Sequence, residues 1–338
     1  MPRVGTLTAA ALILLPIPRP NDGAEPPAPA VAAPAARRST VFAADVKITV
    51  LSTMLAGNPD GGVGEWGFAA LVEVDGRKLL FDTGARPDLV LHNARELGID
   101  LAEVTDVILS HNHDDHVGGL VTLRRELRAR NPAALSRAHV ATGIFWSRVD
   151  GAGKEDNGLL PIRKDYEALG GSFVEHRGPA ELLPGVWFTG PVTRKYPERN
   201  WSGSYTVKTP TGAVEDNIPE DASLVIDTAD GLILLSGCGH AGIVNTVEFA
   251  QEVVRRAPVR AAVGGFHLFR ADEKSLAWTA AKLKDAGLVY LLGAHCTGLE
   301  AVYRIRELAG LSRQNAVVSA VGSSYRSGRG IDPLALAR

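Results

Sequence analysis

The stretch Ser110-His111-Asn112-His113-Asp114-Asp115-His116-Val117-Gly118-Gly119 gathers three imidazoles and two carboxylates within six positions. The apolar run Val104–Leu109 that precedes it predicts a buried strand leading into the stretch. Gly118 and Gly119 would allow a helix to begin in close contact with neighbouring backbone. A polar, solvated loop would need neither feature, so the stretch favours a metal site over a surface loop.

The spacing inside this stretch suits one or two divalent ions. Side chains at positions i and i+2 of extended backbone point the same way, so His111 and His113 are placed to hold one ion together. Asp115 and His116 fall at the turn into a helix expected over Val117–Arg130, where they hold either a second ion or a water against the first. Zinc accepts imidazole nitrogen and carboxylate oxygen, and a catalytic zinc keeps one position open for water.

The body of the chain repeats one pattern twice: two strands joined by a tight turn, then a helix and a further strand. After a first strand at Val46–Leu51, the first unit is expected at Phe68–Val74, Lys78–Phe81, Pro87–Leu97 and Val104–Leu109. The second is expected at Ser223–Ile226, Leu232–Leu235, a helix through Val247–Val254, and Val259–Val263, followed by Ser275–Ala286, Leu288–Leu292, Leu299–Ala309 and Ala316–Val321. This alternation predicts two similar units packed sheet to sheet, with helices outside.

Two segments depart from the pattern. Residues 1–44 begin with an apolar run that contains prolines and continue as an Ala/Pro-rich stretch. We expect a secretory signal peptide and linker outside a catalytic domain at 45–338, hence a periplasmic or secreted protein; the alternative is a cytoplasmic Ala/Pro-rich extension. The apolar run is too short to predict a membrane span. Residues 131–217 are irregular, and we expect them to form an insertion over the mouth of the site rather than to build the central sheets.

Charge and cysteine content narrow the functional classes. The net charge of −2, from 36 basic and 38 acidic residues, gives no global field for holding nucleic acid, so we expect a small-molecule substrate. Two cysteines, Cys238 and Cys296, exclude a disulfide framework. Each lies beside or near a histidine, which fits site chemistry as well as it fits a small buried apolar side chain.

Several motifs resemble those of one enzyme superfamily. His111-x-His113-x-Asp115-His116 is similar to the signature of the metallo-β-lactamase superfamily, and so is Phe81-Asp82-Thr83-Gly84 upstream. Three further segments resemble its branch related to archaeal dihydropterin phosphate synthase of methanopterin biosynthesis: Gly237–Asn245, Gly264–Leu268 and His295–Gly298. The resemblance runs from about Val46 to Val321. It implies an α/β (α+β) fold, a four-layer αββα sandwich with metals at one edge where strand ends converge.

The same resemblance implies a set of ligands. One ion would be surrounded by His111, His113 and His240. The other would be surrounded by Asp115, His116 and His295. The implied cofactor is Zn²⁺, as one or two ions, with Mn²⁺ or iron as alternatives.

The sequence also departs from the superfamily pattern. Many members carry a histidine in a Gly-His-Thr-Pro-like loop, whereas His139 and His176 have no such context and are expected to be ordinary histidines. Cys238 stands near the position where many relatives place a metal-bridging aspartate, so a cysteine ligand is an alternative. Glu220 or Asp221 is a further candidate ligand.

Four further residues lie outside the ligand set. His267 follows a strand and a glycine pair. It is expected either to contact substrate or polarise a leaving group, or to be a structural histidine. Asp82 is expected to support the metal loop through hydrogen bonds. Arg194 either holds an anionic group or lies on the surface. No role is assigned to His92.

These residues predict a metal-dependent hydrolase that activates water against an ester, phosphoester, thioester or lactam, with Asp115 orienting the water or taking its proton. Four alternatives stay open. They are a pterin-related phosphate transferase or synthase, a metallo-nuclease, a non-catalytic metal-binding protein, and, ranked lowest, a di-iron redox enzyme.

Overall fold

The computed structural model describes residues 41–59, 61–198, 200 and 205–335. In this part of the chain no helix is both long and apolar enough to span a bilayer. The predicted signal peptide lies outside the described residues. The predicted domain boundary after residue 44 stays a prediction; Ala43, just before it, is buried, and its N–H donates to the carbonyl of Asp227 at 2.8 Å.

The first sheet has the strand order β18-β17-β1-β2-β3-β4-β5-β7. Its strands are β1 (Val46–Ser52), β2 (Ala69–Val74), β3 (Arg77–Phe81), β4 (Asp106–Ile108), β5 (Arg137–Ala141), β7 (Ser172–His176), β17 (Ser324–Arg326) and β18 (Gly330–Asp332). Asp75 and Gly76, both with positive φ, form the predicted tight turn between β2 and β3. From β3 to β7 the neighbouring strands run parallel.

The second sheet has the strand order β16-β15-β14-β13-β12-β9-β8. Its strands are β8 (Ala180–Leu183), β9 (Val186–Phe188), β12 (Ser223–Thr228), β13 (Gly231–Ser236), β14 (Val259–Gly264), β15 (Tyr290–Gly293) and β16 (Ala316–Val318). The antiparallel hairpin β12–β13 continues into the parallel run β13 to β16. The second sheet therefore repeats the hairpin-then-parallel order of the first, as predicted.

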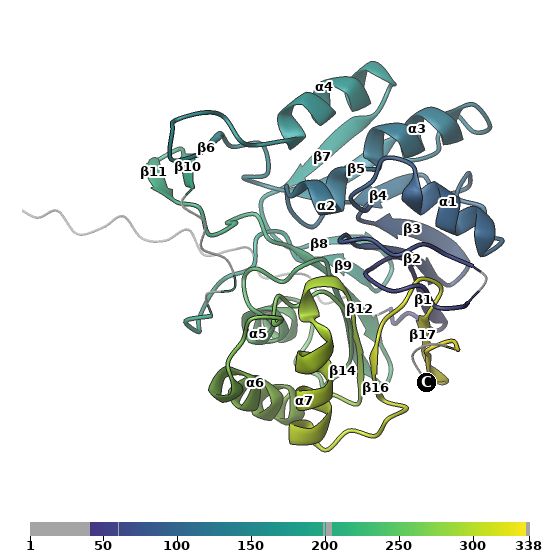
Figure 1. Ribbon diagram of the computed structural model, residues 1–338, viewed down its shortest axis with the longest axis vertical. Helices are drawn as coiled ribbons and strands as arrows, with labels where there is room; N and C mark the ends of the chain where they lie inside the picture. The colour runs from purple at the N-terminus through teal and green to yellow at the C-terminus, as the bar shows by residue number, and fades with distance from the viewer. Residues whose placement is uncertain (1–40, 60, 199, 201–204, 336–338) are drawn as a thin grey trace, which may run out of the picture. The chain divides into compact units, whose positions relative to one another are not determined.

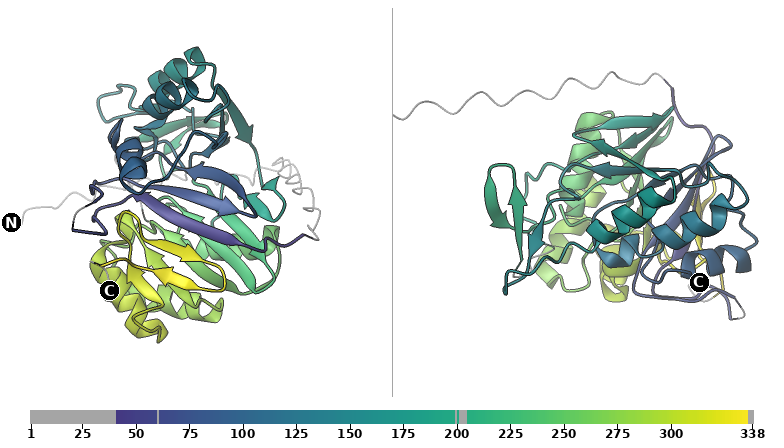
Figure 2. Two further views of the ribbon diagram at one scale, coloured as in Figure 1. Left: turned by 90° about the vertical axis from the view of Figure 1, so that its right-hand side faces the viewer. Right: turned by 90° about the horizontal axis from the view of Figure 1, so that it is seen from above.

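Helices cover the outer face of each sheet (Figure 1). Those on the first sheet are α1 (Leu89–Glu96), α2 (Asp114–Val117), α3 (Leu120–Arg128) and α4 (Leu159–Ala168), and those on the second are α5 (Ile243–Val253), α6 (Glu273–Asp285) and α7 (Leu299–Ala309). One apolar core lies between the sheets and another lies under each helical layer. The predicted four-layer αββα sandwich is confirmed, and Figure 2 shows the same layers from two further sides.

Two predictions about the fold need correction. Residues 131–217 do build the central sheets, because they contribute β5 and β7 to the first sheet and β8 and β9 to the second. A separate small sheet comes from the same segment, formed by β6 (Arg148–Val149), β10 (Thr206–Thr209) and β11 (Gly212–Glu215). The strands expected from the sequence also end at Val321, whereas β17 follows Val321 and pairs with β1.

The helix predicted over 117–130 starts earlier and is interrupted. It begins at Asp114 and divides into α2 and α3 at Gly118 and Gly119. A Cβ atom on Gly118 would lie 2.0 Å from the carbonyl oxygen of Ala85, and one on Gly119 would lie 2.2 Å from that of Thr83. The glycine pair therefore allows the close backbone approach that the sequence predicts.

Candidate metal centre

The candidate site lies where parallel strands of both sheets end. The residues that follow these strands are Asp82 after β3, His111 after β4, His240 after β13, His267 after β14 and His295 after β15. Ligands of open α/β sheets bind beyond the carboxyl ends of the strands, where loops converge. Asp82, His267 and His295 have φ values of 55°, 48° and 45°. Non-glycine residues held in this region of φ cluster at functional sites.

Six side chains from these loops form what we call the donor cluster: His111, His113, Asp115, His116, His240 and His295. Within it, the nitrogen atoms of His111, His113 and His240 lie within 4.8 Å of one another. A second group with the same limit comprises Asp115, His116 and His295. The structure thus brings together both predicted ligand sets; their role as ligands stays a prediction.

In the first set His111 and His240 are buried and His113 is half-buried, and the three imidazoles carry little charge. Burial, and then the neighbouring His116, hold the pKa of His111 well below its usual value, and burial does the same for His240. Burial also lowers the pKa of His113 to about 3. Neutral imidazole is the form that binds a metal ion.

The second set pairs a carboxylate with imidazoles, and the carboxylate and the ring of His116 shift the pKa of each other. Burial opposes ionisation of Asp115, but the adjacent His116 and the hydrogen bond from His295 hold its pKa below its usual range. Burial also opposes the charge on His116, yet Asp115 and Asp82 raise the pKa of that ring to about 9. The Nε2 atom of His295 lies 3.2 Å from Oδ2 of Asp115.

Asp82 supports the donor cluster as predicted. Its Oδ2 lies 2.7 Å from Nδ1 of His116, which leaves Nε2 of that ring directed at the site. The same carboxylate accepts hydrogen bonds from the backbone N–H of Ser110 at 2.8 Å and from its hydroxyl at 2.7 Å. That hydroxyl lies 2.9 Å from Nδ1 of His111. One buried carboxylate therefore orients a histidine from each set.

The two candidate acidic ligands, Asp221 and Glu220, contact neighbouring loops, and their role as ligands stays a prediction. Asp221 accepts a hydrogen bond from the N–H of Ala241 at 2.9 Å, and this contact anchors the residue after His240. Arg194 is half-buried, and its guanidinium donates to the carbonyl of His240 at 3.2 Å. Among the described residues, neither Asp221 nor Glu220 belongs to a group of side chains whose ligand atoms all lie within 4.8 Å of one another.

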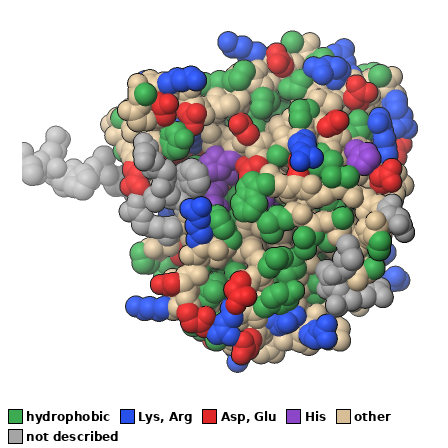
Figure 3. Space-filling view, viewed as in Figure 1, with side chains coloured by type: hydrophobic (Ala, Val, Ile, Leu, Met, Phe, Trp, Pro, Cys, Tyr) green, Lys and Arg blue, Asp and Glu red, His purple; other side chains and the backbone are tan. Residues whose placement is uncertain are grey.

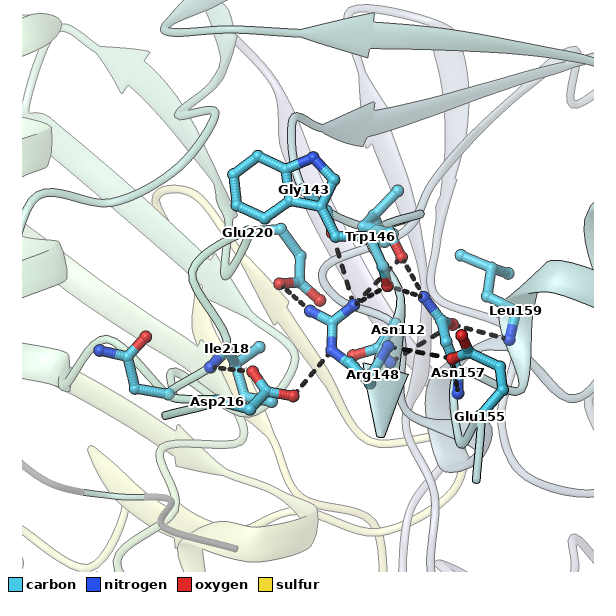
Figure 4. Close-up of polar contacts among 12 residues, drawn as sticks. Asn112, Gly143, Trp146, Arg148, Glu155, Asn157, Leu159, Asp216, Ile218 and Glu220 are labelled. Carbon is cyan, nitrogen blue, oxygen red and sulfur yellow. Dashed lines mark hydrogen bonds and ion pairs between the residues drawn. The ribbon is translucent and has the colours of Figure 1, made fainter. Parts of the chain in front are cut away.

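Glu220 belongs to a buried network around Arg148 (Figure 4). The guanidinium of Arg148 pairs with Glu220 and, at 2.8 Å, with Asp216. Its remaining N–H groups point to backbone carbonyls, among them that of Trp146 at 3.2 Å. Because its donors are used internally, Arg148 ties β6 to the loop before β12 rather than holding substrate.

An open cleft of about 1250 Å³ leads to the donor cluster. In the face drawn in Figure 3, histidines reach the surface among acidic and hydrophobic side chains. Sequence reasoning missed most of the aromatic lining, which includes Trp66, Tyr196, Tyr205, Phe269 and Trp278. These positions come from five separate segments, and no local spacing marks them as neighbours.

Comparison with known proteins agrees with this geometry. The model of the metallo-β-lactamase superfamily matches residues 67–194. A synthase of Methanocaldococcus jannaschii, 7,8-dihydropterin-6-methyl-4-(β-D-ribofuranosyl)-aminobenzene-5′-phosphate synthase, is 32% identical over 270 residues, which are 76% of this chain and 89% of the relative. The chain belongs to the metallo-β-lactamase superfamily.

Solved structures of the superfamily share the fold. Tm1679, described as a metal-dependent hydrolase of the β-lactamase superfamily, is 26% identical with a TM-score of 0.66, over 82% of this chain and 98% of its own. The metallo-β-lactamase fold protein YhfI from Bacillus subtilis is 11% identical with a TM-score of 0.53, over 84% of this chain and 100% of its own. Superfamily members generally bind divalent metal ions.

Proposed function

We propose that this protein is a metal-dependent hydrolase that holds one or two zinc-type ions in the donor cluster. The observation that carries the proposal is that two sets of three donor atoms meet at the end of a large cleft. The donors are imidazole nitrogens and one carboxylate oxygen, the ligands that zinc accepts in catalytic sites. Manganese and iron are the alternatives.

One buried atom supports the fit directly. Nε2 of His111 is buried and has no hydrogen-bond partner among the described residues, while Nδ1 of the same ring contacts Ser110. Leaving a buried polar atom unpaired costs about 1–3 kcal/mol. A cation at this position would remove that cost. A divalent ion held there lowers the pKa of a bound water and neutralises negative charge that develops on the substrate.

Asp115 and His267 carry the remaining chemistry in this proposal. Asp115 is ionised and lines the cleft, so its carboxylate orients the attacking water and accepts its proton. His267 also lines the cleft, and burial lowers its pKa to about 4, so its ring is neutral at pH 7. A neutral imidazole donates one hydrogen bond, which His267 directs to an oxygen of the substrate.

The test combines metal analysis with a panel of ester, phosphodiester, thioester and lactam substrates. We expect bound transition metal and at least one hydrolysis that stops with chelator and returns with zinc. Asp115→Asn should abolish that activity, whereas His92→Gln should not, since His92 is an exposed residue of α1. Full metal content with no chelator-sensitive turnover would favour a metal-binding protein without catalytic function.

A synthase is the second candidate, and the relative of 32% identity favours it. That protein's name describes a product with a dihydropterin, an aminobenzene and a phosphate. The aromatic side chains of the cleft, such as Trp66 and Trp278, are suited to contact flat rings. Product formation from a dihydropterin donor and ribofuranosyl-aminobenzene phosphate, without any hydrolysis in the panel, would replace the first candidate with this one.

A further inference from the structure

Two aromatic side chains lie at the mouth of the cleft, beside the donor cluster. Trp66 is 49% exposed and Phe269 is 39% exposed. Of the large hydrophobic side chains that are exposed in the described parts of the chain, only these two line the cleft. Figure 3 shows hydrophobic side chains next to histidines on this face. Exposed apolar surface gathered in one place marks a binding surface. We call Trp66 and Phe269 the aromatic wall.

The aromatic wall contacts the histidines of the site directly. The centre of the Trp66 ring lies 4.7 Å from that of His295 and 5.5 Å from that of Phe269. The Phe269 ring in turn lies 5.2 Å from the ring of His267. His295 belongs to the donor cluster, and His267 is the ring that we expect to donate to an oxygen of the substrate. A group that covers the aromatic wall therefore lies next to the reacting bond.

Backbone hydrogen bonds hold both rings in place. Phe68, two residues after Trp66, donates its N–H to the carbonyl of Asp115 at 3.1 Å. Phe269 donates its own N–H to the carbonyl of Cys296, the residue after His295, at 3.2 Å. Each side of the aromatic wall is therefore tied to a loop that carries a member of the donor cluster. Side chains held in this way lose little freedom when a ligand binds.

A second aromatic pair of the cleft is more enclosed. Tyr196 and Trp278 are half-buried, and the centres of their rings lie 5.5 Å apart. The Nζ atom of Lys282 lies 5.0 Å from the centre of the Tyr196 ring. The aromatic wall is more exposed than this pair and contacts the donor cluster. It is therefore the better surface for a group of the substrate close to the reacting bond.

We propose that the substrate carries an aromatic ring next to its reacting carbonyl or phosphorus, and that Trp66 and Phe269 bind this ring and determine specificity. The inference rests on the proposed metal-dependent hydrolase. Aromatic rings that pack edge to face or with an offset attract each other beyond the area they bury. A small aliphatic substrate would leave both side chains exposed to water. The aromatic wall thus favours aryl phosphates and esters of aromatic acids over their aliphatic counterparts.

The experiment uses Co²⁺-loaded protein and two hydroxamates, whose oxygen atoms chelate the metal. Acetohydroxamate has a methyl group where benzohydroxamate has a phenyl ring. Visible absorption of the cobalt follows each titration. We expect the parent to bind benzohydroxamate roughly tenfold more tightly than acetohydroxamate, and Trp66→Ala and Phe269→Ala to lose most of this preference. Tyr303→Ala is the matched control and should keep it, because Tyr303 is 47% exposed but does not line the cleft.

The affinity for acetohydroxamate separates a contact with the ring from a general disturbance of the site. It should stay the same in all four proteins, because none of the three substitutions removes a donor from the donor cluster. Trp66→Phe, which keeps an aromatic ring, should retain most of the preference for benzohydroxamate. An acetohydroxamate affinity that falls as far as the benzohydroxamate affinity in Trp66→Ala and Phe269→Ala would show that the aromatic wall only supports the metal loops, and would overturn the inference.

Three further outcomes would also contradict it. Equal binding of the two hydroxamates by the parent would overturn the inference and leave the proposed metal site intact. An equal loss of preference in Tyr303→Ala would show that the ring does not bind at the aromatic wall. A second copy of the chain is the alternative occupant, and sedimentation of a parent dimer that Trp66→Ala dissociates would favour it. A parent that binds no cobalt would instead remove the proposed function, and this inference with it.

Discussion

Two groups of histidines differ in how their nitrogen atoms are used, one on the first sheet and one where strands of both sheets end. In the group on the first sheet, Nδ1 of His139 lies 3.0 Å from Nε2 of His176, and Nε2 of His139 lies 2.9 Å from Oδ1 of Asp106. Both nitrogens of His139 are therefore satisfied by other side chains. We call these three residues the His139 group.

The donor cluster differs because one of its buried ring nitrogens has no such contact. The rings of His111, His113 and His240 meet nearly edge to face, with centroids between 4.6 and 4.9 Å apart, and Nε2 of His111 has no hydrogen-bond partner in the described parts of the chain. An aspartate supports each group, Asp82 in one and Asp106 in the other. A histidine next to an aspartate is thus not enough to predict a metal site, whereas several ligand nitrogens within 4.8 Å of one another favour one.

The same substitution made in each group is the strongest test of this difference. His113→Gln should reduce bound metal and lower activity by more than the roughly 10–100-fold that an outer hydrogen-bond partner costs. His139→Gln should leave both unchanged, because it removes no donor from the cluster. Elemental analysis and initial rates measure both. Equal metal loss in the two variants would contradict the distinction between the groups.

The supporting aspartates allow a second, smaller comparison. Asp82→Asn weakens the hold on His116, so we expect metal affinity to fall by roughly 10–100-fold. Asp106→Asn changes a carboxylate that binds His139 and Arg137, and it should leave metal affinity unchanged. Competition with a chromogenic chelator measures the affinities. Unchanged affinity in Asp82→Asn would show that this carboxylate only stabilises the fold.

That the residues of the donor cluster lie together could be predicted from the sequence, because the strands before them can be recognised as short apolar runs. The stretch from His111 to His116 follows a short apolar strand, and His240 and His295 each follow another. Strand ends of a parallel sheet meet at one edge. This local pattern of apolar runs therefore agrees with the ligand sets that the family resemblance implies.

The strands of residues 131–217 could not be predicted in the same way. β5 and β7 each include a histidine and another polar residue, so neither shows a continuous apolar run. β9 and β17 have only three residues each and are defined by their partners β12 and β1. Short strands of this kind depend on long-range pairing rather than on local preference.

The His139 group should contribute to stability rather than to metal binding. His139→Gln cannot keep both hydrogen bonds of the native ring, so the free energy of unfolding should fall by about 1 kcal/mol, the net value of one hydrogen bond. Urea unfolding of metal-free protein measures the change. His92→Gln, at an exposed position of α1, serves as the control, and an equal decrease in that variant would show that the loss does not come from the contacts of His139.

The smallest effect concerns the pH dependence of stability. Burial, and then the neighbouring His139, lower the pKa of His176 in the folded protein below its usual value of 6.5. Below pH 6.5 the unfolded chain takes up a proton that the folded chain resists, so this residue makes stability fall as the pH falls. His176→Gln removes the titrating group, and its stability relative to the parent should therefore rise between pH 7 and pH 5. Urea unfolding of both metal-free proteins across this range measures the difference, which isolates His176 from the donor cluster because those histidines are common to both. A difference that stays constant with pH would show that His176 has the same pKa in the folded and unfolded chains, and that its contact with His139 does not depend on a neutral ring.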